Sequence, residues 1–566
     1  MSLNRTRQLL IAASLVALLG ALCACWVIPF RLRFQAPGCE YTFGYVGDEY
    51  NYAQRVQPLI PGTTASNTIN GIGDPRIISP FFLDDLCRLL VTAIGLEITS
   101  FIWIWHAATP VVLAAVLFWM ARASIPAGRE PWALPLTLAL AAAALPALFC
   151  TYDLVTVFPP LQGFLNRFPT NIEYPLAGAL VCALLSFLQR PSAGRGVLLA
   201  LLSASLVYLR PFAVLPWALT VTGCVLFSTF KRETPLRVLG VLAGIFLAAL
   251  LPWLWILLHN RGLPVYQQMI MRWFPSEPYR LHPRWPLFLA LAALLAGTAL
   301  LLTHWRRWVA LASAAVMLAL PFLPGLLSQS VQLTSFDRFG CYYLVALVSV
   351  ALLAVGEHAS RKPSLWTRKF CSRAVVCLAV LSLALSGVLA ARNLSFDFAA
   401  GPGPYGYAVQ ELQYLPAYRW VAEHTPPDCF FLLDDGCDWS QAPLDEKALL
   451  EWQRSLMTDE DLFPLVARRR RVYSNWLYGA AISHQDLEDL AVLQRGTFGL
   501  RGIEPGAYKR VLKKLLPQYI FWRRTAPIPR GYAKNLQPLS EILYSDPVCE
   551  IRRLNYFKQP AAQEQR

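Results

Sequence analysis

The feature that most constrains this sequence is a series of long apolar blocks that fills residues 1–395. A helix needs about 17–25 apolar residues to cross the hydrocarbon core of a bilayer, and many of the blocks have that length. Of the 566 residues, 56% are hydrophobic and only 15% are charged, which excludes an ordinary soluble enzyme and a disordered protein. We therefore predict a polytopic α-helical membrane domain over residues 1–395, followed by a small soluble α/β domain over residues 396–566.

About eleven candidate spans can be identified by length and polarity. They cover residues 8–29, 92–121, 132–150, 172–189, 197–209, 212–229, 236–258, 286–303, 308–327, 340–356 and 374–391. The fifth and sixth are short and joined at Arg210 and Pro211, which is typical of a hairpin that only just crosses. The first span ends in polar residues with no small-residue cleavage site after it, so we interpret it as a retained anchor.

Basic residues gather in every second connection between the spans. They are Arg5, Arg7, Arg122, Arg129, Arg190, Arg195, Lys231, Arg232, Arg237, Arg306, Arg307, Arg361, Lys362, Arg368, Lys369 and Arg373. By the positive-inside rule these loops and the N-terminus face the cytoplasm. The pattern predicts a multi-pass cell (inner) membrane protein whose C-terminal domain is extracytoplasmic. It also accounts for much of the net charge of +15 without a nucleic-acid partner.

The first outer loop, residues 30–91, is far longer than a connection needs and carries the carboxylates Asp48 and Glu49. The segment is predicted to form a short helix, in which Asp48, Tyr52 and Arg55 share a face. A carboxylate just beyond a membrane span can accept a proton from a hydroxyl, or hold a divalent cation such as Mg²⁺ or Mn²⁺. The ordinary alternative is a pair of solvated acids that stabilise a helix start.

The order of these parts resembles that of the GT-C glycosyltransferases. Both have a first span, a long outer loop that opens here with Gly47-Asp48-Glu49-Tyr50, many further spans and a soluble outer domain. This superfamily includes protein O-mannosyltransferases and aminoarabinose transferases, which take a sugar from a polyprenyl-phosphate donor and invert the anomeric carbon. The resemblance implies that Asp48 is the base, and that the segment from Asp74 to Phe82 is the amphipathic jaw before the second span.

The same resemblance implies further site residues. Asp153 follows the third span, where relatives often carry a second acid. Arg338 matches an Arg-Tyr motif of the family, although Phe339 replaces the usual Tyr here. Arg167 and Arg210 lie in turns that resemble the family's Arg-Pro or Lys-Pro turns at span ends. Arg210 is explained equally well as a cation that snorkels from a span end.

Transfer of a sugar from a lipid phosphate requires a base for the acceptor hydroxyl and cations for the departing phosphate. Asp48 is the predicted base, and Glu49 and Asp153 are the other candidate catalytic carboxylates. A guanidinium binds phosphate through a planar, bidentate fork. Arg338, Arg272 and Arg167 are therefore the predicted phosphate-binding residues.

The outer segment at residues 259–285 is basic and aromatic. It either gates the lipid entrance or contacts lipid head groups, and head-group contact is the simpler role for most of its residues. We expect His259 and His282, together with Tyr52 and Arg55, to line the substrate site. Neither histidine has a third ligand at close spacing, so we do not predict a metal site around them.

The C-terminal domain has the alternating elements of an α/β fold. We predict strands over residues 429–433, 471–473 and 519–522, and helices over residues 441–456 and 505–516. No nucleophile elbow, Walker loop or dinucleotide fingerprint occurs in it, so we interpret it as an acceptor-binding or structural module. A disulfide between Cys429 and Cys437 is chemically possible on the outer side.

Two other classes of function stay open. A transporter or lipid flippase would show paired repeats and charges buried in mid-span, whereas this sequence has no convincing internal repeat and most of its acids lie in loops. A non-catalytic membrane scaffold would leave the first-loop acids facing solvent. The enzyme hypothesis predicts as partners a lipid-linked sugar donor, membrane lipids and a glycan, lipid or protein acceptor, and it fixes neither the sugar nor the acceptor.

Overall fold

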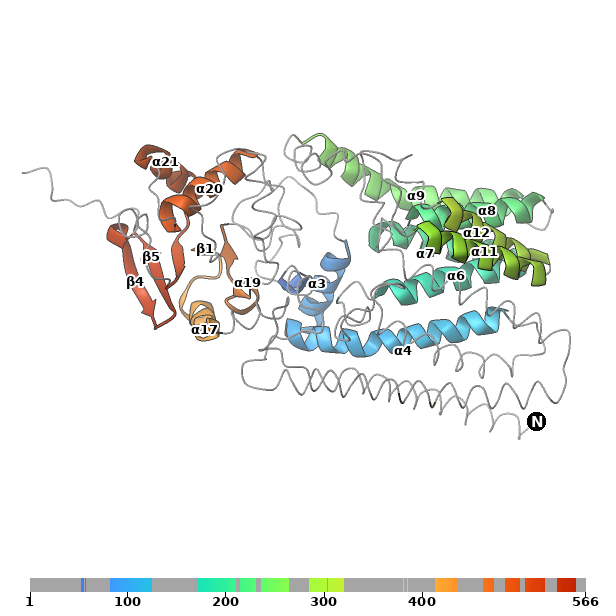
Figure 1. Cartoon of the computed structure of the whole chain (residues 1–566), viewed down its shortest axis with the longest axis horizontal. Coiled ribbons are helices and arrows are strands. Elements are labelled where there is room, and N and C mark those ends of the chain that lie inside the picture. The colour runs from blue at the N-terminus through green and yellow to red at the C-terminus, as the bar shows by residue number, and fades with distance from the viewer. Residues whose placement is uncertain are drawn as a thin grey trace, which may run out of the picture. The chain divides into compact units, whose positions relative to one another are not determined.

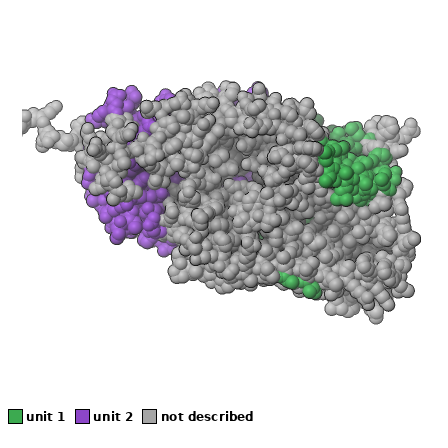
Figure 2. Space-filling view, viewed as in Figure 1, with its two compact units in different colours: residues 1–35, 100–257, 274–396 green, residues 36–99, 258–273, 397–566 purple. Residues whose placement is uncertain are grey.

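The chain forms two compact units in a computed structural model (Figures 1 and 2). The structure describes residues 52–54, 56–57, 82–124, 168, 172–209, 214–230, 236–263, 285–302, 304–319, 380, 384, 413–434, 462–472, 484–498, 504–524 and 537–555. The first unit takes residues 1–35, 100–257 and 274–396. The second unit takes residues 36–99, 258–273 and 397–566. Parts of two predicted outer loops thus belong to the same unit as the C-terminal domain.

Apolar helices make up almost all of the described part of the first unit (Figure 1). They are α4 (Ile98–Ser124), α6 (Glu173–Gln189), α7 (Ala193–Leu209), α8 (Val214–Phe230), α9 (Leu236–Arg261), α11 (Trp285–Leu301) and α12 (His304–Ala319). Helices α6, α7, α8, α9 and α11 begin and end within a few residues of the predicted spans, and α12 begins earlier. The predicted spans 8–29, 132–150 and 340–356, and nearly all of 374–391, lie outside the described residues.

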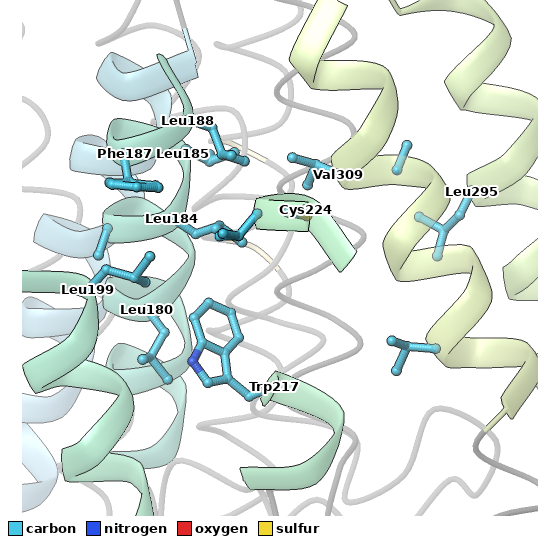
Figure 3. Packing of buried hydrophobic residues seen from close by; sticks show 14 of the residues in the cluster. Leu180, Leu184, Leu185, Phe187, Leu188, Leu199, Trp217, Cys224, Leu295 and Val309 are labelled. Atoms are coloured by element: carbon cyan, nitrogen blue, oxygen red, sulfur yellow. The ribbon is translucent and has the colours of Figure 1, made fainter. Parts of the chain in front are cut away.

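The helices of the first unit pack through leucines and small residues. Figure 3 shows side chains from several of these helices meeting in one cluster, with Trp217 among them. The buried Trp217 indole donates a hydrogen bond to Ser203 Oγ at 2.8 Å. A Cβ on Gly223 would lie 3.3 Å from the Ala312 side chain, so α8 and α12 approach closely at this glycine. Small residues at close helix crossings are typical of membrane helix packing.

One described helix segment, Val238–Arg261, is long and apolar enough by itself to cross a membrane. It exposes Leu247, Leu251 and Leu258, as a helix in contact with lipid does. The pair Phe82–Ile94 and Ile98–Thr109 also passes this test when taken together, but it is bent by 113°.

The predicted span 92–121 needs a correction at its start. Residues 92–94 belong to a separate helix, α3 (Phe82–Ile94), and α4 begins only at Ile98. Gly95 lies between them with a φ of +71°, a left-handed conformation that glycine adopts without a steric penalty. Hydropathy continues across the glycine, which is why the sequence predicted one continuous span.

A five-stranded sheet forms the centre of the C-terminal domain. Its strands are β1 (Phe430–Leu433), β2 (Arg470–Arg471), β3 (Tyr519–Arg523), β4 (Ser540–Ser545) and β5 (Cys549–Leu554), in the order β2-β1-β3-β5-β4. The first three are parallel, and β5 and β4 are antiparallel. The sheet is therefore mixed. The three predicted strands correspond to β1, β2 and β3. Strand β2 ends at Arg471, two residues before the end of the strand predicted over residues 471–473.

Helices cover both faces of this sheet (Figure 1). They are α17 (Leu415–His424) and α19 (Phe463–Val466) on one face, and α20 (His484–Phe498) and α21 (Pro505–Leu515) on the other. Tyr418 and Phe521 pack with a ring separation of 5.2 Å on the α17 face, and Phe463 lies beside both. Ile520 and Trp522 point to the opposite face, because side chains alternate along a strand.

A buried arginine secures the end of α17. Arg469 Nε donates to Thr425 Oγ1 at 3.0 Å, and Nη2 donates to the carbonyls of Ala422 (2.9 Å) and Thr425. A cation at these carbonyls satisfies the free helix end, and burial lowers the pKa of Arg469. Burial also raises the pKa of the nearby Cys429, which is a free thiol. Its predicted disulfide partner Cys437 lies outside the described residues.

Gly496 is the point where α20 meets α21, and replacing it with Ala should destabilise the domain. The new Cβ would lie 2.1 Å from Cδ2 of Tyr508. That ring is buried, and its hydroxyl is 3.0 Å from Thr497 Oγ1, so it has little room to move. We expect Gly496→Ala to cost about 1–3 kcal/mol, measured by amide hydrogen exchange in α20 and α21.

Gly506→Ala is the matched control for this change. Its new Cβ would meet only the Glu504 carboxylate, at 3.3 Å, and that side chain is flexible. Alanine also favours a helix over glycine by up to about 1 kcal/mol. A loss of protection in Gly506→Ala as large as in Gly496→Ala would show that the clash with Tyr508 is not the cause.

Candidate functional site

Most of the predicted site residues lie outside the part of the chain that the structure describes. These are Asp48, Glu49, Arg55, Asp153, Arg167, Arg272, His282 and Arg338. Their roles stay predictions. Two of the predicted site residues, Tyr52 and His259, are described. The described geometry of the candidate site is therefore that of the Tyr52 turn, of α3 and of the end of α9.

The first described element of the site is a helical turn that contains Tyr52, Ala53, Gln54 and Val56. This agrees with the short helix predicted from the sequence. The backbone N–H of Gln57 donates to the carbonyl of Ala53 at 3.0 Å. Ala53 and Val56 are completely buried, whereas Tyr52 is only half-buried. The turn is therefore packed on one side and leaves the Tyr52 side more open.

Two carboxamides on this turn were not among the residues predicted from the sequence. Gln54 and Gln57 are 1% and 6% exposed, which is rare for glutamine. Within the described residues, Oε1 of Gln57 accepts no hydrogen bond. A buried acceptor without a donor costs about 1–3 kcal/mol, so each such atom calls for an explanation. In the sequence, only the position of Gln57 shortly after Asp48 and Glu49 could have drawn attention to it.

Helix α3 buries two charged side chains on the same side as Leu83, Cys87 and Val91, and it exposes large apolar side chains. Its buried face carries Asp84 and Arg88, which are 3% and 7% exposed. Leu86, Leu89 and Ile94 are exposed by 42%, 64% and 59%. Asp84 and Arg88 are four residues apart, so they lie on the same face of the helix. The predicted jaw segment ends at Phe82, the first residue of this helix, and Asp84 and Arg88 were not among the predicted site residues.

The burial of these two charged side chains, together with the exposed apolar ones, determines what α3 can do. A carboxylate and a guanidinium are costly to bury unless they have partners, and both residues interact with other groups in the protein. The exposed leucines suit the acyl region at a membrane surface. Helix α3 can therefore hold charged groups on its protein side while its other side contacts lipid.

His259 lies in the last turn of α9, and its side chain is exposed. The next residue, Asn260, is completely buried. Both belong to the second unit, as does the Tyr52 turn. Over the described ranges, His, Cys, Asp and Glu residues form no group of three that could hold a metal ion. The carboxylates predicted as metal ligands, Asp48 and Glu49, lie outside those ranges.

An ion pair joins the C-terminal domain to the connection between α3 and α4. Arg468 Nη2 lies 3.6 Å from Glu97 Oε1, and the side chains are 58% and 73% exposed. Such an exposed pair contributes about 0–1 kcal/mol. The pair shows that the second unit brings together segments that are far apart in the sequence, but it provides little stability.

No model of a known protein family matches the chain, and no curated protein matches it. Several chains of solved structures are similar to it, among them the following two. One is the archaeal oligosaccharyltransferase AglB from Archaeoglobus fulgidus in complex with an inhibitory peptide and a dolichol-phosphate. It has 11% identity and a TM-score of 0.43, and the match covers 91% of this chain and 70% of AglB. The other is ArnT from Cupriavidus metallidurans bound to undecaprenyl phosphate. It has 12% identity and a TM-score of 0.47, and the match covers 97% of this chain and 98% of ArnT.

Both structures contain a lipid phosphate, dolichol-phosphate in AglB and undecaprenyl phosphate in ArnT. With TM-scores below 0.5, neither likeness carries an argument about activity.

Proposed function

We propose that this chain is an integral membrane glycosyltransferase. It transfers a sugar from a polyprenyl-phosphate donor to an acceptor on the extracytoplasmic face, with inversion at the anomeric carbon. The proposal rests most directly on α3, which buries Asp84 and Arg88, exposes large apolar side chains and precedes an apolar helix. A transferase that uses a lipid-linked donor needs charged groups right beside lipid, and α3 combines the two.

The direction of α3 supports this role. Helices α3 and α4 are bent by 113° at Gly95. If α4 crosses the bilayer, a bend of this size lays α3 along the membrane surface, where its exposed leucines are buried in the acyl boundary. The buried face with Asp84 and Arg88 then lies at the depth of lipid phosphates. The orientation of the whole chain follows the basic loops, with the N-terminus in the cytoplasm and the C-terminal domain outside.

The proposed reaction needs one proton acceptor and a cationic site for phosphate. Asp48 accepts the proton of the acceptor hydroxyl, and that oxygen forms a bond to the anomeric carbon from the side opposite the phosphate. The bond between the anomeric carbon and the phosphate oxygen breaks, and polyprenyl phosphate leaves with the electron pair. Arg338, Arg272 and Arg167 bind the departing phosphate.

The remaining predicted residues have supporting roles in this proposal. Asp153 is the proposed second acid, and Tyr52, four residues after Asp48 in the sequence and thus one turn later in the predicted helix, would contact the acceptor. Carboxylate oxygens are the ligands that Mg²⁺ prefers, so Asp48 and Glu49 would hold a divalent cation in an enzyme that uses one. His259 and His282 would line the entrance for the lipid.

The proposed function predicts that the purified protein consumes a lipid-linked sugar. The protein would be reconstituted into nanodiscs with polyprenyl-phosphate sugars and candidate acceptors. We expect free polyprenyl phosphate to appear together with a glycosylated acceptor of inverted anomeric configuration, as NMR would show. A product of retained configuration would contradict the proposed inversion. Movement of intact donor across the membrane of sealed vesicles that contain the protein, without cleavage, would contradict the whole proposal and support a flippase.

A further inference from the structure

A small group of aromatic side chains lies where α17 meets β4 in the C-terminal domain. Trp420 and His424 of α17 stack with ring centroids 4.7 Å apart and ring planes 6° apart. The ring of Tyr544, from β4, lies 5.4 Å from that of Trp420. We name Trp420, His424 and Tyr544 the aromatic platform. Its parts come from segments far apart in the sequence, so no motif reveals it.

The platform is separate from the aromatic core beneath α17. Core residues such as Tyr418, Phe463 and Phe521 are fully buried. In contrast, Trp420 and Tyr544 are half-buried and His424 is exposed. Internal packing therefore leaves part of these three residues accessible to a ligand.

Hydrogen bonds hold the platform in place before any ligand arrives. His424 Nδ1 lies 2.9 Å from the Trp420 carbonyl. The Tyr544 hydroxyl donates to Asp546 Oδ2 at 3.0 Å, and Asp546 Oδ1 accepts the backbone N–H groups of Val548 and Cys549 at 2.8 and 2.7 Å. A ring fixed in advance loses little conformational entropy on binding.

These bonds also affect the ionisation of the tyrosine and the aspartate. Burial and the bond to Asp546 raise the pKa of Tyr544 to about 12. Burial acts to raise the pKa of Asp546, but hydrogen bonds from Cys549 and Val548 outweigh it and hold that pKa below its ordinary value. Tyr544 is therefore a neutral donor and Asp546 an anionic acceptor at neutral pH.

Polar groups also lie on this part of the domain. In the described part of the chain, the indole N–H of Trp420 and Nε2 of His424 make no hydrogen bond to protein. Glu541 and Arg553 are register partners on β4 and β5, and both are exposed. They lie on the same face as Tyr544, because Tyr544 pairs with Ile551, two residues before Arg553. The same face of the sheet thus carries an aromatic ring of the platform, a cationic donor and an anionic acceptor.

We propose that the aromatic platform binds a pyranose ring of a carbohydrate chain. A pyranose presents a flat face of C–H groups with hydroxyls around its edge. The C–H groups carry partial positive charge and are attracted to the negative face of an aromatic ring. The hydroxyls can pair with the indole N–H, the imidazole nitrogen and the charged residues nearby. Ring faces with a few placed polar groups are typical of small-ligand sites.

This inference extends the proposed function, because the bound chain would be the acceptor or the glycan part of an acceptor. Binding itself does not depend on catalysis, so the two can fail separately. If the protein binds the carbohydrate chain but cleaves no donor, the carbohydrate-binding proposal is supported and the glycosyltransferase proposal is contradicted. If the protein cleaves donor but does not bind the carbohydrate chain, only the carbohydrate-binding proposal is contradicted.

The test uses the full-length protein in nanodiscs, without donor. The probes are maltohexaose, mannohexaose and chitohexaose, which differ in linkage and hydroxyl pattern, and binding is measured by saturation-transfer NMR and calorimetry. We expect the wild type to bind at least one of them. Trp420→Ala should weaken that binding about tenfold or more, in line with the loss of one stacked ring.

Three further variants separate the causes. Trp420→Phe keeps a ring and should recover part of the affinity. His424→Ala removes an exposed ring with little risk to folding and should weaken binding several-fold. Lys513→Ala, on α21 across the sheet, should leave affinity unchanged. Failure of all three hexasaccharides to bind the wild type would overturn the proposal, as would equal affinity in Trp420→Ala, His424→Ala and Lys513→Ala.

Discussion

Replacing Asp48 with Asn is expected to lower donor turnover by about 10²–10⁴-fold, the usual cost of losing a general base. Asparagine keeps the size and most of the hydrogen bonding of the aspartate but cannot accept the acceptor's proton. The protein should still fold, because an acid at an exposed helix start contributes only about 0.3–1 kcal/mol. The substitution also leaves in place Ala53 and Val56, the fully buried residues that pack the following turn. Release of polyprenyl phosphate in nanodiscs, alongside a melting curve, measures both effects.

Glu49→Gln is the matched control for Asp48→Asn. A larger loss in Glu49→Gln would make Glu49 the base. Comparable losses that added Mg²⁺ or Mn²⁺ reverses would instead indicate a metal site shared by the two carboxylates. Near-normal turnover in both variants would show that Asp48 and Glu49 are only solvated acids at a helix start. The glycosyltransferase proposal would then lose its central residue.

Replacing Arg338 with Ala is expected to lower donor turnover by about 10²–10³-fold, the cost of losing one group that stabilises developing charge. Arg338→Lys should recover only part of the activity, because an ammonium lacks the planar fork that binds two phosphate oxygens. The measurements are donor binding and single-turnover release of polyprenyl phosphate. Together they separate loss of donor affinity from loss of rate.

Arg510→Ala is the control for a general loss of positive charge, since Arg510 is exposed on α21 in the C-terminal domain. It should leave turnover unchanged. Donor binding and turnover that are equally normal in Arg338→Ala would show that Arg338 does not bind phosphate. The same assay on Arg272→Ala and Arg167→Ala would then decide which of the predicted arginines does.

Much of the helical unit could be predicted from the sequence because its signal is local. A block such as Pro175–Gln189 is apolar over the length of a helix whatever it packs against, and α6 lies there. The buried strands β1 and β3 are also local signals, since each is a short run of aromatic and aliphatic residues. The prediction of a catalytic base came from a short motif around Asp48, and the turnover of Asp48→Asn and Glu49→Gln tests it.

The tertiary structure decided what local patterns leave open. The bend at Gly95 separates α3 from α4 although the apolar run continues, and only burial shows that α3 turns Asp84 inward and Leu89 outward. The β4–β5 hairpin makes the sheet mixed, because β5 pairs antiparallel with β3. Trp420 and Tyr544 become one surface only when α17 packs beside β4. Hydropathy and propensity belong to single segments, whereas exposure and ring contacts depend on which distant segments meet.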